Sequence, residues 1–320
     1  MMRRFLYRCL FFCLPLLLTL LALELLIGNQ NAKFFSEKKM ASVFQNSGRA
    51  YEWVNKIRHP RKIFLLGSSS VKYGLSSGQL NQLSQDSLSF INLAADARDP
   101  IETFFILQQL DLTNVKAMYM GIDPWIFTRH YYRNRHQYLL LDLSFAKALQ
   151  YSRDYDLRLF AKRYKALFGL ADPDHQPAPL VSTPPTDFGS VALTRKPANF
   201  NDPVSRKFKL SQYGWSDLQF IHLQKIAALC KKRGIAFITF YLPRRSDWVE
   251  DYRKNCSSVH RSFLLQLKKV GYTDSIKGNV LESLPGGDGL FADGYHLNKE
   301  GQKNYTLQWW EQLKKVPPHP

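Results

Sequence analysis

The chain has 320 residues, which is enough to bury one sizeable hydrophobic core or two small ones. Hydrophobic residues make up 45% of it, and this content excludes wholesale disorder. The formal net charge of +18 at pH 7 indicates an anionic partner, which at this point is a lipid headgroup, an acidic cell-surface polymer or nucleic acid.

The N-terminal segment is predicted to be a membrane anchor. Residues 9–28, CLFFCLPLLLTLLALELLIG, carry Glu24 as their only charge, and a helix of about twenty residues spans a hydrocarbon core of about 30 Å. Arginines precede the run, so residues 1–8 are expected in the cytoplasm and the main domain in the periplasm or at the cell surface. A cleaved signal peptide is the alternative, although no clear cleavage site follows. An extracytoplasmic domain excludes nucleic acid and favours membrane lipid and an anionic surface polymer as partners.

The four cysteines indicate no function. Cys9 and Cys13 lie in the predicted membrane segment, whereas Cys230 and Cys256 fall in the soluble part. In an oxidising compartment Cys230 and Cys256 either form a disulfide or remain as two free thiols, and the sequence leaves both alternatives open.

After a polar stalk at residues 29–60, short apolar runs alternate with amphipathic segments. Strands are expected at residues 62–67, 88–94, 115–123 and 235–243. Helices are expected at residues 76–85, 100–110, 216–234 and 298–315, the last with Asn298 as its N-cap. This alternation predicts an α/β domain at residues 61–315 with a mostly parallel, doubly wound sheet.

Residues 128–210 interrupt the alternation. They contain an Arg- and Tyr-rich stretch, RHYYRNRHQY, and a Pro-rich loop, ADPDHQPAPLVSTPPTDF. A loop of this length is usually functional or disordered, so we interpret the region as an insertion near the strand ends. Arg129, Arg133 and Arg135 are candidates for binding an acceptor, and a solvated basic face is the alternative for them.

A Gly-Ser-Ser-Ser turn, residues 67–70, follows the first predicted strand, at the sheet edge where parallel sheets bind ligands. The glycine permits a sharp turn, and a serine here is a candidate nucleophile if a base lies nearby; otherwise the serines only cap the next helix. Near the other end of the chain, LFADGYHLNKEG places Asp293 three residues before His296, a spacing that lets the carboxylate orient the imidazole. A surface Asp and His in a loop are the alternative. No metal site is predicted, because no second histidine has ligand spacing, and His222 is expected to be structural.

Together, LLGSSSVKYG and DGYHLNKEG resemble the first and last sequence blocks of the SGNH (GDSL-type) hydrolase superfamily. The resemblance covers roughly residues 60–315 apart from the insertion. It implies a three-layer α/β/α sandwich with Ser69 as the nucleophile, His296 as the base and Asp293 as the carboxylate that orients it. It implies no metal and no organic cofactor.

The middle blocks of that family, which supply a glycine and an asparagine as oxyanion donors, differ here. NLAADARD has Ala94 or Ala95 where the glycine is expected, and GIDPW has Asp123 where the asparagine would fall. An ionised carboxylate cannot donate a hydrogen bond, and losing one oxyanion donor costs about 10²–10³ in rate. A protonated Asp123, the side chain of Asn92 or a backbone group would have to substitute, or hydrolysis is not the function.

The whole layout resembles that of membrane-anchored bacterial proteins that acylate cell-surface polymers, in teichoic acid D-alanylation or exopolysaccharide O-acetylation. This resemblance implies an extracytoplasmic acyltransferase or esterase that acts on a surface polysaccharide or polymer beside a polytopic membrane-bound O-acyltransferase. A catalytically inactive SGNH-fold scaffold or polymer-binding protein is the alternative, which Asp123 favours. A plain carbohydrate or lipid esterase is a third.

Overall fold

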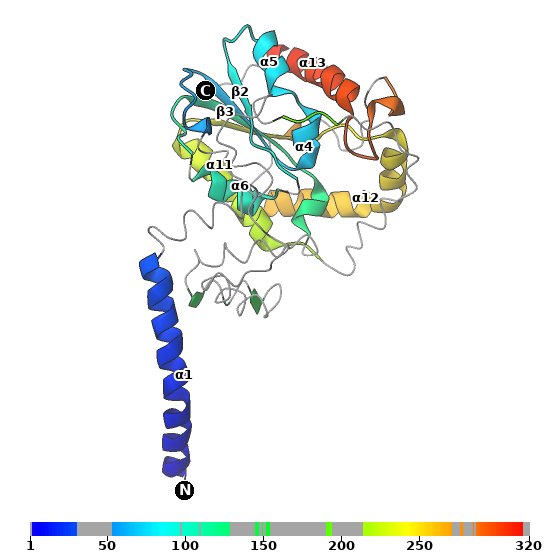
Figure 1. The fold of residues 1–320 in the computed structure, drawn as a ribbon. Coiled ribbons are helices and arrows are strands. Elements are labelled where there is room, and N and C mark those ends of the chain that lie inside the picture. Colours follow the sequence, from blue (N-terminus) through cyan, green and yellow to red (C-terminus); the bar gives the residue numbers. More distant parts are fainter. Residues whose placement is uncertain are drawn as a thin grey trace. The chain divides into compact units, whose positions relative to one another are not determined.

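Figure 1 shows the chain as a computed structural model, which describes residues 2–30, 53–96, 98–108, 110–128, 145–146, 149, 152–153, 190–193, 214–270, 276–277, 284 and 286–315. The chain divides into two units, one formed by residues 1–45 and 132–179 and the other by residues 46–131 and 180–320. Most of the predicted stalk and insertion lies outside the described residues, so their boundaries stay predictions.

The predicted anchor, residues 9–28, lies within α1 (Met2–Gln30), a helix of the first unit that continues through Pro15. Of the helices that the structure describes, none combines the length and the apolar character needed to cross a membrane. The transmembrane helix expected from the sequence is therefore not confirmed.

The second unit is built on a five-stranded sheet with the order β2-β1-β3-β4-β5, in which every neighbouring pair is parallel. The strands are β1 (Lys62–Leu66), β2 (Ser89–Asn92), β3 (Val115–Gly121), β4 (Ala236–Phe240) and β5 (Ile276–Lys277). The first four agree with the predicted strands, and the α/β fold with a parallel sheet is confirmed. Because β2 and β3 flank β1 on opposite sides, the chain reverses direction across the sheet there. The carboxyl ends of β1 and β3 thus form the crevice where such sheets bind ligands.

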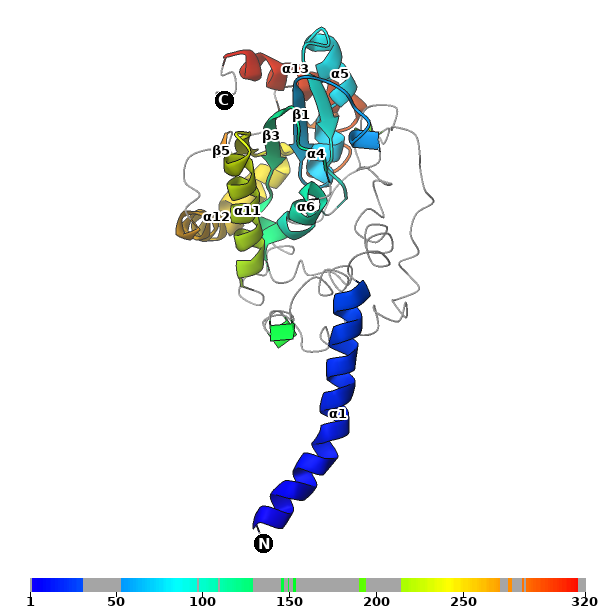
Figure 2. The same ribbon diagram turned by 90° about the vertical axis from the view of Figure 1, so that its left-hand side faces the viewer.

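Helices cover both faces of the sheet (Figures 1 and 2). On one face α13 (Lys299–Lys315) contacts α4 (Ser69–Gly74) and α5 (Ser77–Leu83), and on the other α6 (Pro100–Leu107) contacts α11 (Asp217–Lys232). The remaining elements are α12 (Ser246–Lys269) and the short 3-10 helices η1 (Pro124–Phe127) and η5 (Asp288–Leu290). The elements α4, α12 and β5 were not predicted from the sequence.

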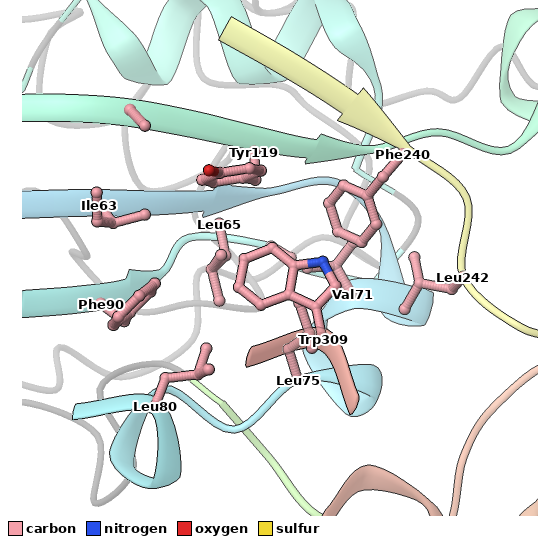
Figure 3. Packing of buried hydrophobic residues seen from close by; sticks show 12 residues of the cluster. Ile63, Leu65, Val71, Leu75, Leu80, Phe90, Tyr119, Phe240, Leu242 and Trp309 are labelled. Atoms are coloured by element: carbon pink, nitrogen blue, oxygen red, sulfur yellow. The ribbon is translucent and has the colours of Figure 1, made fainter. Parts of the chain in front are cut away.

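Trp309 of α13 packs against the sheet at the centre of the hydrophobic core (Figure 3). Its ring centroid lies 5.0 Å from that of Tyr119 on β3 and 5.8 Å from that of Phe240 on β4. Removing a buried tryptophan side chain typically costs about 3–5 kcal/mol. This contact holds α13 against the sheet, and with it the loop that precedes α13 at the carboxyl ends of the strands.

Cys230 and Cys256 are buried and form no disulfide, so the free-thiol alternative is confirmed. Burial raises the pKa of Cys230 to about 12 and that of Cys256 to about 11. Both thiols therefore stay protonated at neutral pH and contribute to the core as small apolar side chains.

Candidate active site

The turn after β1 requires a glycine. Gly67 has a φ of +134°, and a Cβ added to it would lie 2.7 Å from the carbonyl oxygen of Gly121. The hydroxyl of Ser68 then caps α4 by accepting a hydrogen bond of 3.4 Å from the N–H of Ser70. Ser69 is the first residue of α4, so its own N–H has no carbonyl partner within the helix. Ser68 is therefore the serine that caps α4. Ser69 is the first residue of the helix, and its hydroxyl is not part of the cap.

The hydroxyl of Ser69 meets the late Asp-x-x-His segment. Ser69 Oγ lies 2.8 Å from His296 Nε2, and His296 Nδ1 lies 2.7 Å from Asp293 Oδ2. Because a carboxylate only accepts hydrogen bonds, these contacts assign the proton to Nδ1 and leave Nε2 to accept the serine proton. The structure thus brings together three residues predicted from the sequence, across a separation of 227 positions between Ser69 and His296.

Asp293 is held in an ionised state. Its Oδ1 accepts hydrogen bonds from the backbone N–H groups of Tyr295 at 2.9 Å and His296 at 2.8 Å. Burial raises the pKa of this carboxyl, but the hydrogen bond and charge of His296, together with the two N–H groups, outweigh burial and hold the pKa below its ordinary value of 3.8. A negative charge at this point stabilises an imidazolium at His296.

Two tyrosines restrict the imidazole of His296. The ring of Tyr73, on α4, packs edge-on at a centroid distance of 5.4 Å, and the ring of Tyr295 lies 4.2 Å away. The His296 side chain is 14% exposed, so the ring is largely enclosed by protein. Packing on two sides limits rotation of the ring and keeps Nε2 directed at Ser69.

Asp123 is not placed as an oxyanion donor. Its Oδ1 forms an ion pair with the guanidinium of Arg244, and its Oδ2 accepts hydrogen bonds of 3.1 Å from the hydroxyls of both Ser68 and Ser70. The side chains of Asp123 and Arg244 are only 2% and 1% exposed. In these contacts both carboxylate oxygens of Asp123 act as acceptors, so an ionised Asp123 has no hydrogen to donate to an oxyanion.

The other three oxyanion candidates are also engaged in contacts within the protein. The Asn92 amide donates to two carbonyl oxygens of the α4 segment, at 3.3 Å each, and its Oδ1 accepts the N–H of Ala94 at 3.0 Å. The N–H of Ala95 donates to the carbonyl of Gly67 at 3.2 Å. The predicted acceptor-binding residues Arg129, Arg133 and Arg135 lie outside the described residues.

Arg244 is a residue of the site that was not predicted from the sequence. Its Nη1 donates to the Ser70 hydroxyl at 3.3 Å and to the carbonyl of Tyr295 at 3.1 Å, while its Nη2 bonds Asp123. Burial lowers the pKa of Arg244 to about 10, so the side chain is still cationic at neutral pH. A signal for it was present, since LPRR follows β4 and the residues after neighbouring parallel strands meet at one edge of the sheet.

His222 has a structural role, as expected from its place on an amphipathic helix. Its Nδ1 lies 2.8 Å from the carbonyl oxygen of Leu218, one turn earlier in α11, and its ring packs edge-on against Phe104. Within the described residues, no cluster of three or more His, Cys, Asp or Glu side chains is arranged to hold a metal ion.

No family model and no curated protein matches the chain. Among solved structures, the chain is similar to a proposed platelet activating factor from Streptococcus pneumonia, at 9% sequence identity and a TM-score of 0.38. The match covers 83% of this chain and 88% of that one. A similarity this low carries no argument about function, and the parallel α/β fold rests on the structure of the chain itself.

Proposed function

We propose that the chain is an SGNH-type serine esterase or O-acyltransferase, with Ser69 as the nucleophile, His296 as the base and Asp293 as the carboxylate that orients it. One observation carries this proposal: the continuous hydrogen bonds from Ser69 Oγ to His296 Nε2 at 2.8 Å and from His296 Nδ1 to Asp293 at 2.7 Å. A serine hydroxyl becomes a useful nucleophile only when a base is within hydrogen-bond reach, and this geometry meets that requirement.

In the first half of the reaction, Ser69 Oγ attacks the carbonyl carbon of an ester while His296 Nε2 takes the hydroxyl proton. The C–O bond of the ester then breaks, His296 gives its proton to the departing oxygen, and an alcohol leaves. In the second half, water or an acceptor hydroxyl attacks the acyl group on Ser69, and His296 takes the proton of that nucleophile. The bond between the acyl carbon and Ser69 Oγ then breaks, His296 returns the proton to Oγ, and the acid or the new ester leaves. Asp293 stabilises the imidazolium in both halves.

The oxyanion forms beside the first turn of α4, where the N–H of Ser69 has no helical partner. The asparagine donor expected from the resemblance is replaced by Asp123, which is paired with Arg244. Because losing one oxyanion donor typically costs about 10²–10³ in rate, we expect slow turnover of simple activated esters.

The proposal extends to the substrate class, location and partners. The acyl acceptor or donor is a cell-surface polysaccharide or polymer, the domain is extracytoplasmic, and a polytopic membrane-bound O-acyltransferase is the partner. Support comes from the resemblance to surface-polymer acylation proteins and from the net charge of +18, which attracts anionic polymers and lipid surfaces.

A non-catalytic scaffold or polymer-binding protein is the second candidate, and the acidic residue at position 123 favours it. Labelling of the full chain with a fluorophosphonate serine probe separates the two, with Ser69→Ala and His296→Ala as test variants and His59→Ala as the control. We expect labelling of the wild type and the control and its loss in both test variants. An unlabelled wild type would contradict the esterase proposal and favour the scaffold.

A further inference from the structure

We propose that Asp123 and Arg244 are positioning residues that set the distance between nucleophile and base, because together they hold both chain segments that carry the reacting side chains. This inference rests on the proposed function. It assigns the ion pair to the geometry of the site and not to direct contact with substrate, since both side chains are almost fully buried.

On the nucleophile side, the hydroxyls of three consecutive serines contact two different partners, Asp123 and His296. The outer two, Ser68 and Ser70, are 0% and 2% exposed, and both donate to Oδ2 of Asp123 at 3.1 Å. The middle one, Ser69, is left to meet His296. Anchoring both neighbours to one carboxylate oxygen fixes the orientation of the first turn of α4, and so fixes the direction of the Ser69 Cα–Cβ bond.

On the base side, Arg244 supports the loop that carries the imidazole. Its Nη1 donates to the carbonyl oxygen of Tyr295, the residue before His296, at 3.1 Å. The next residue, Arg245, donates its backbone N–H to the carbonyl of Gly294 at 3.2 Å. The segment after β4 therefore bonds two consecutive carbonyls of the base loop.

A single guanidinium joins the two sides. Nη1 of Arg244 bonds both Ser70 Oγ, at 3.3 Å, and the Tyr295 carbonyl, while Nη2 bonds Asp123. The planar guanidinium offers several donors in fixed directions, which the ammonium of lysine does not. An ion pair buried this deeply is weak evidence for stability, because desolvation offsets its attraction. Its position between the two segments gives it a role in geometry, and misplacing reacting groups by about 1 Å can cost about 100-fold in rate.

The experiment measures saturation kinetics of fluorophosphonate labelling of the full chain, which separate the maximal labelling rate from the probe concentration at half-saturation. The variants are Ser70→Ala, which keeps the ion pair, and Arg244→Lys, which keeps the charge but loses the planar set of donors. The control is Arg261→Gln, an exposed arginine of α12 that contacts neither segment. We expect the maximal rate to fall about 10-fold in Ser70→Ala and about 100-fold in Arg244→Lys, with half-saturation unchanged and the control like the wild type.

A purely structural role would lower the melting temperature of these variants without changing the maximal rate per folded molecule. Folded Ser70→Ala that labels within twofold of the wild type overturns the inference and leaves the proposed function intact. This variant also decides the matter if Arg244→Lys does not fold. A wild type that does not label overturns the proposed function itself, and the inference with it.

Discussion

Replacing Asp293 with asparagine exchanges one acceptor oxygen for an amide while keeping the shape of the side chain. In the Asn variant, the remaining carbonyl oxygen can still accept the backbone N–H groups of Tyr295 and His296, which Oδ1 accepts at 2.9 and 2.8 Å in the wild type. The base loop should therefore keep its conformation. The change falls on the 2.7 Å contact with His296 Nδ1, where an NH₂ group now faces the ring.

The magnitude follows from that contact. A hydrogen bond to a charged group is worth about 1.5–3 kcal/mol, and about 1.4 kcal/mol corresponds to a factor of ten, so loss of imidazolium stabilisation alone lowers the rate about 10-fold to 150-fold. The amide also favours the tautomer with the proton on Nε2, which then donates to Ser69 instead of accepting its proton. Where that exchange has been made in a serine triad, the total loss was about 10⁴. We expect a fall between about 10² and 10⁴.

The assay is the rate of fluorophosphonate labelling near pH 8, compared between the wild type, Asp293→Asn and the control Asp288→Asn. Asp288 precedes Asp293 in the same loop region and bonds Ser246 through both carboxylate oxygens, away from the imidazole. The control should label like the wild type. Labelling of Asp293→Asn within threefold of the wild type would refute the assignment of Asp293 as the carboxylate that orients His296.

Gly67→Ala is expected to lower the free energy of unfolding in a urea titration by at least about 2 kcal/mol, because of its φ of +134° and its close approach to the backbone of β3. Gly234→Ala, whose Cβ would meet open space, is the control and should cost about 1 kcal/mol. Burial lowers the pKa of His260 in the folded chain below its ordinary value of 6.5. As the pH falls through 6.5, the unfolded chain therefore binds a proton before the folded chain does, and the free energy of unfolding of the wild type decreases. In urea titrations at a series of pH values, His260→Gln should show a smaller decrease in the free energy of unfolding than the wild type. An equal decrease in both would contradict the role of His260. Cys230 and Cys256 should react with a thiol reagent only after denaturation, whereas a disulfide found by mass spectrometry would contradict the free thiols.

The elements predicted from the sequence are those whose signals are local. β1 after Lys62 and β3 after Lys116 are apolar runs, typical of strands buried on both faces of a sheet. The helices α6 and α11 begin with capping residues, Asp99 and Ser216, whose side chains accept backbone hydrogen bonds in the structure. Such patterns follow from the backbone geometry of a few neighbouring residues, so a single sequence is sufficient to recognise them.

The helix α12 was missed because its buried face is chemically mixed. Buried positions such as Trp248, Tyr252, Cys256 and Phe263 recur at helical spacing, but the intervening residues are strongly polar, and the N-cap residue makes no side-chain capping bond. Here packing against the rest of the unit, which a local pattern does not reveal, decides the burial.

In the site, Ser69, Asp293 and His296 were recognisable as the residue types that acyl chemistry needs, but their contact depends on long-range packing. The ion pair between Asp123 and Arg244 was not predicted, because no local sequence pattern around either residue indicates its partner. The two meet only because β3 and β4 are adjacent and parallel, so that the residues following them share one edge of the sheet.

Because Ser69 and His296 are 227 positions apart in the sequence, the serine and its base come together only late in synthesis and folding. During synthesis the nucleophile turn is made long before the base loop, and until that loop is held in place by α13, through Trp309, the serine is an ordinary unreactive alcohol. Under the proposed function, an unfinished or misassembled chain therefore would not capture acyl groups. Labelling of Ser69 by the fluorophosphonate probe should therefore occur only in completely folded molecules. The extent of labelling is then also a measure of the folded fraction of a preparation.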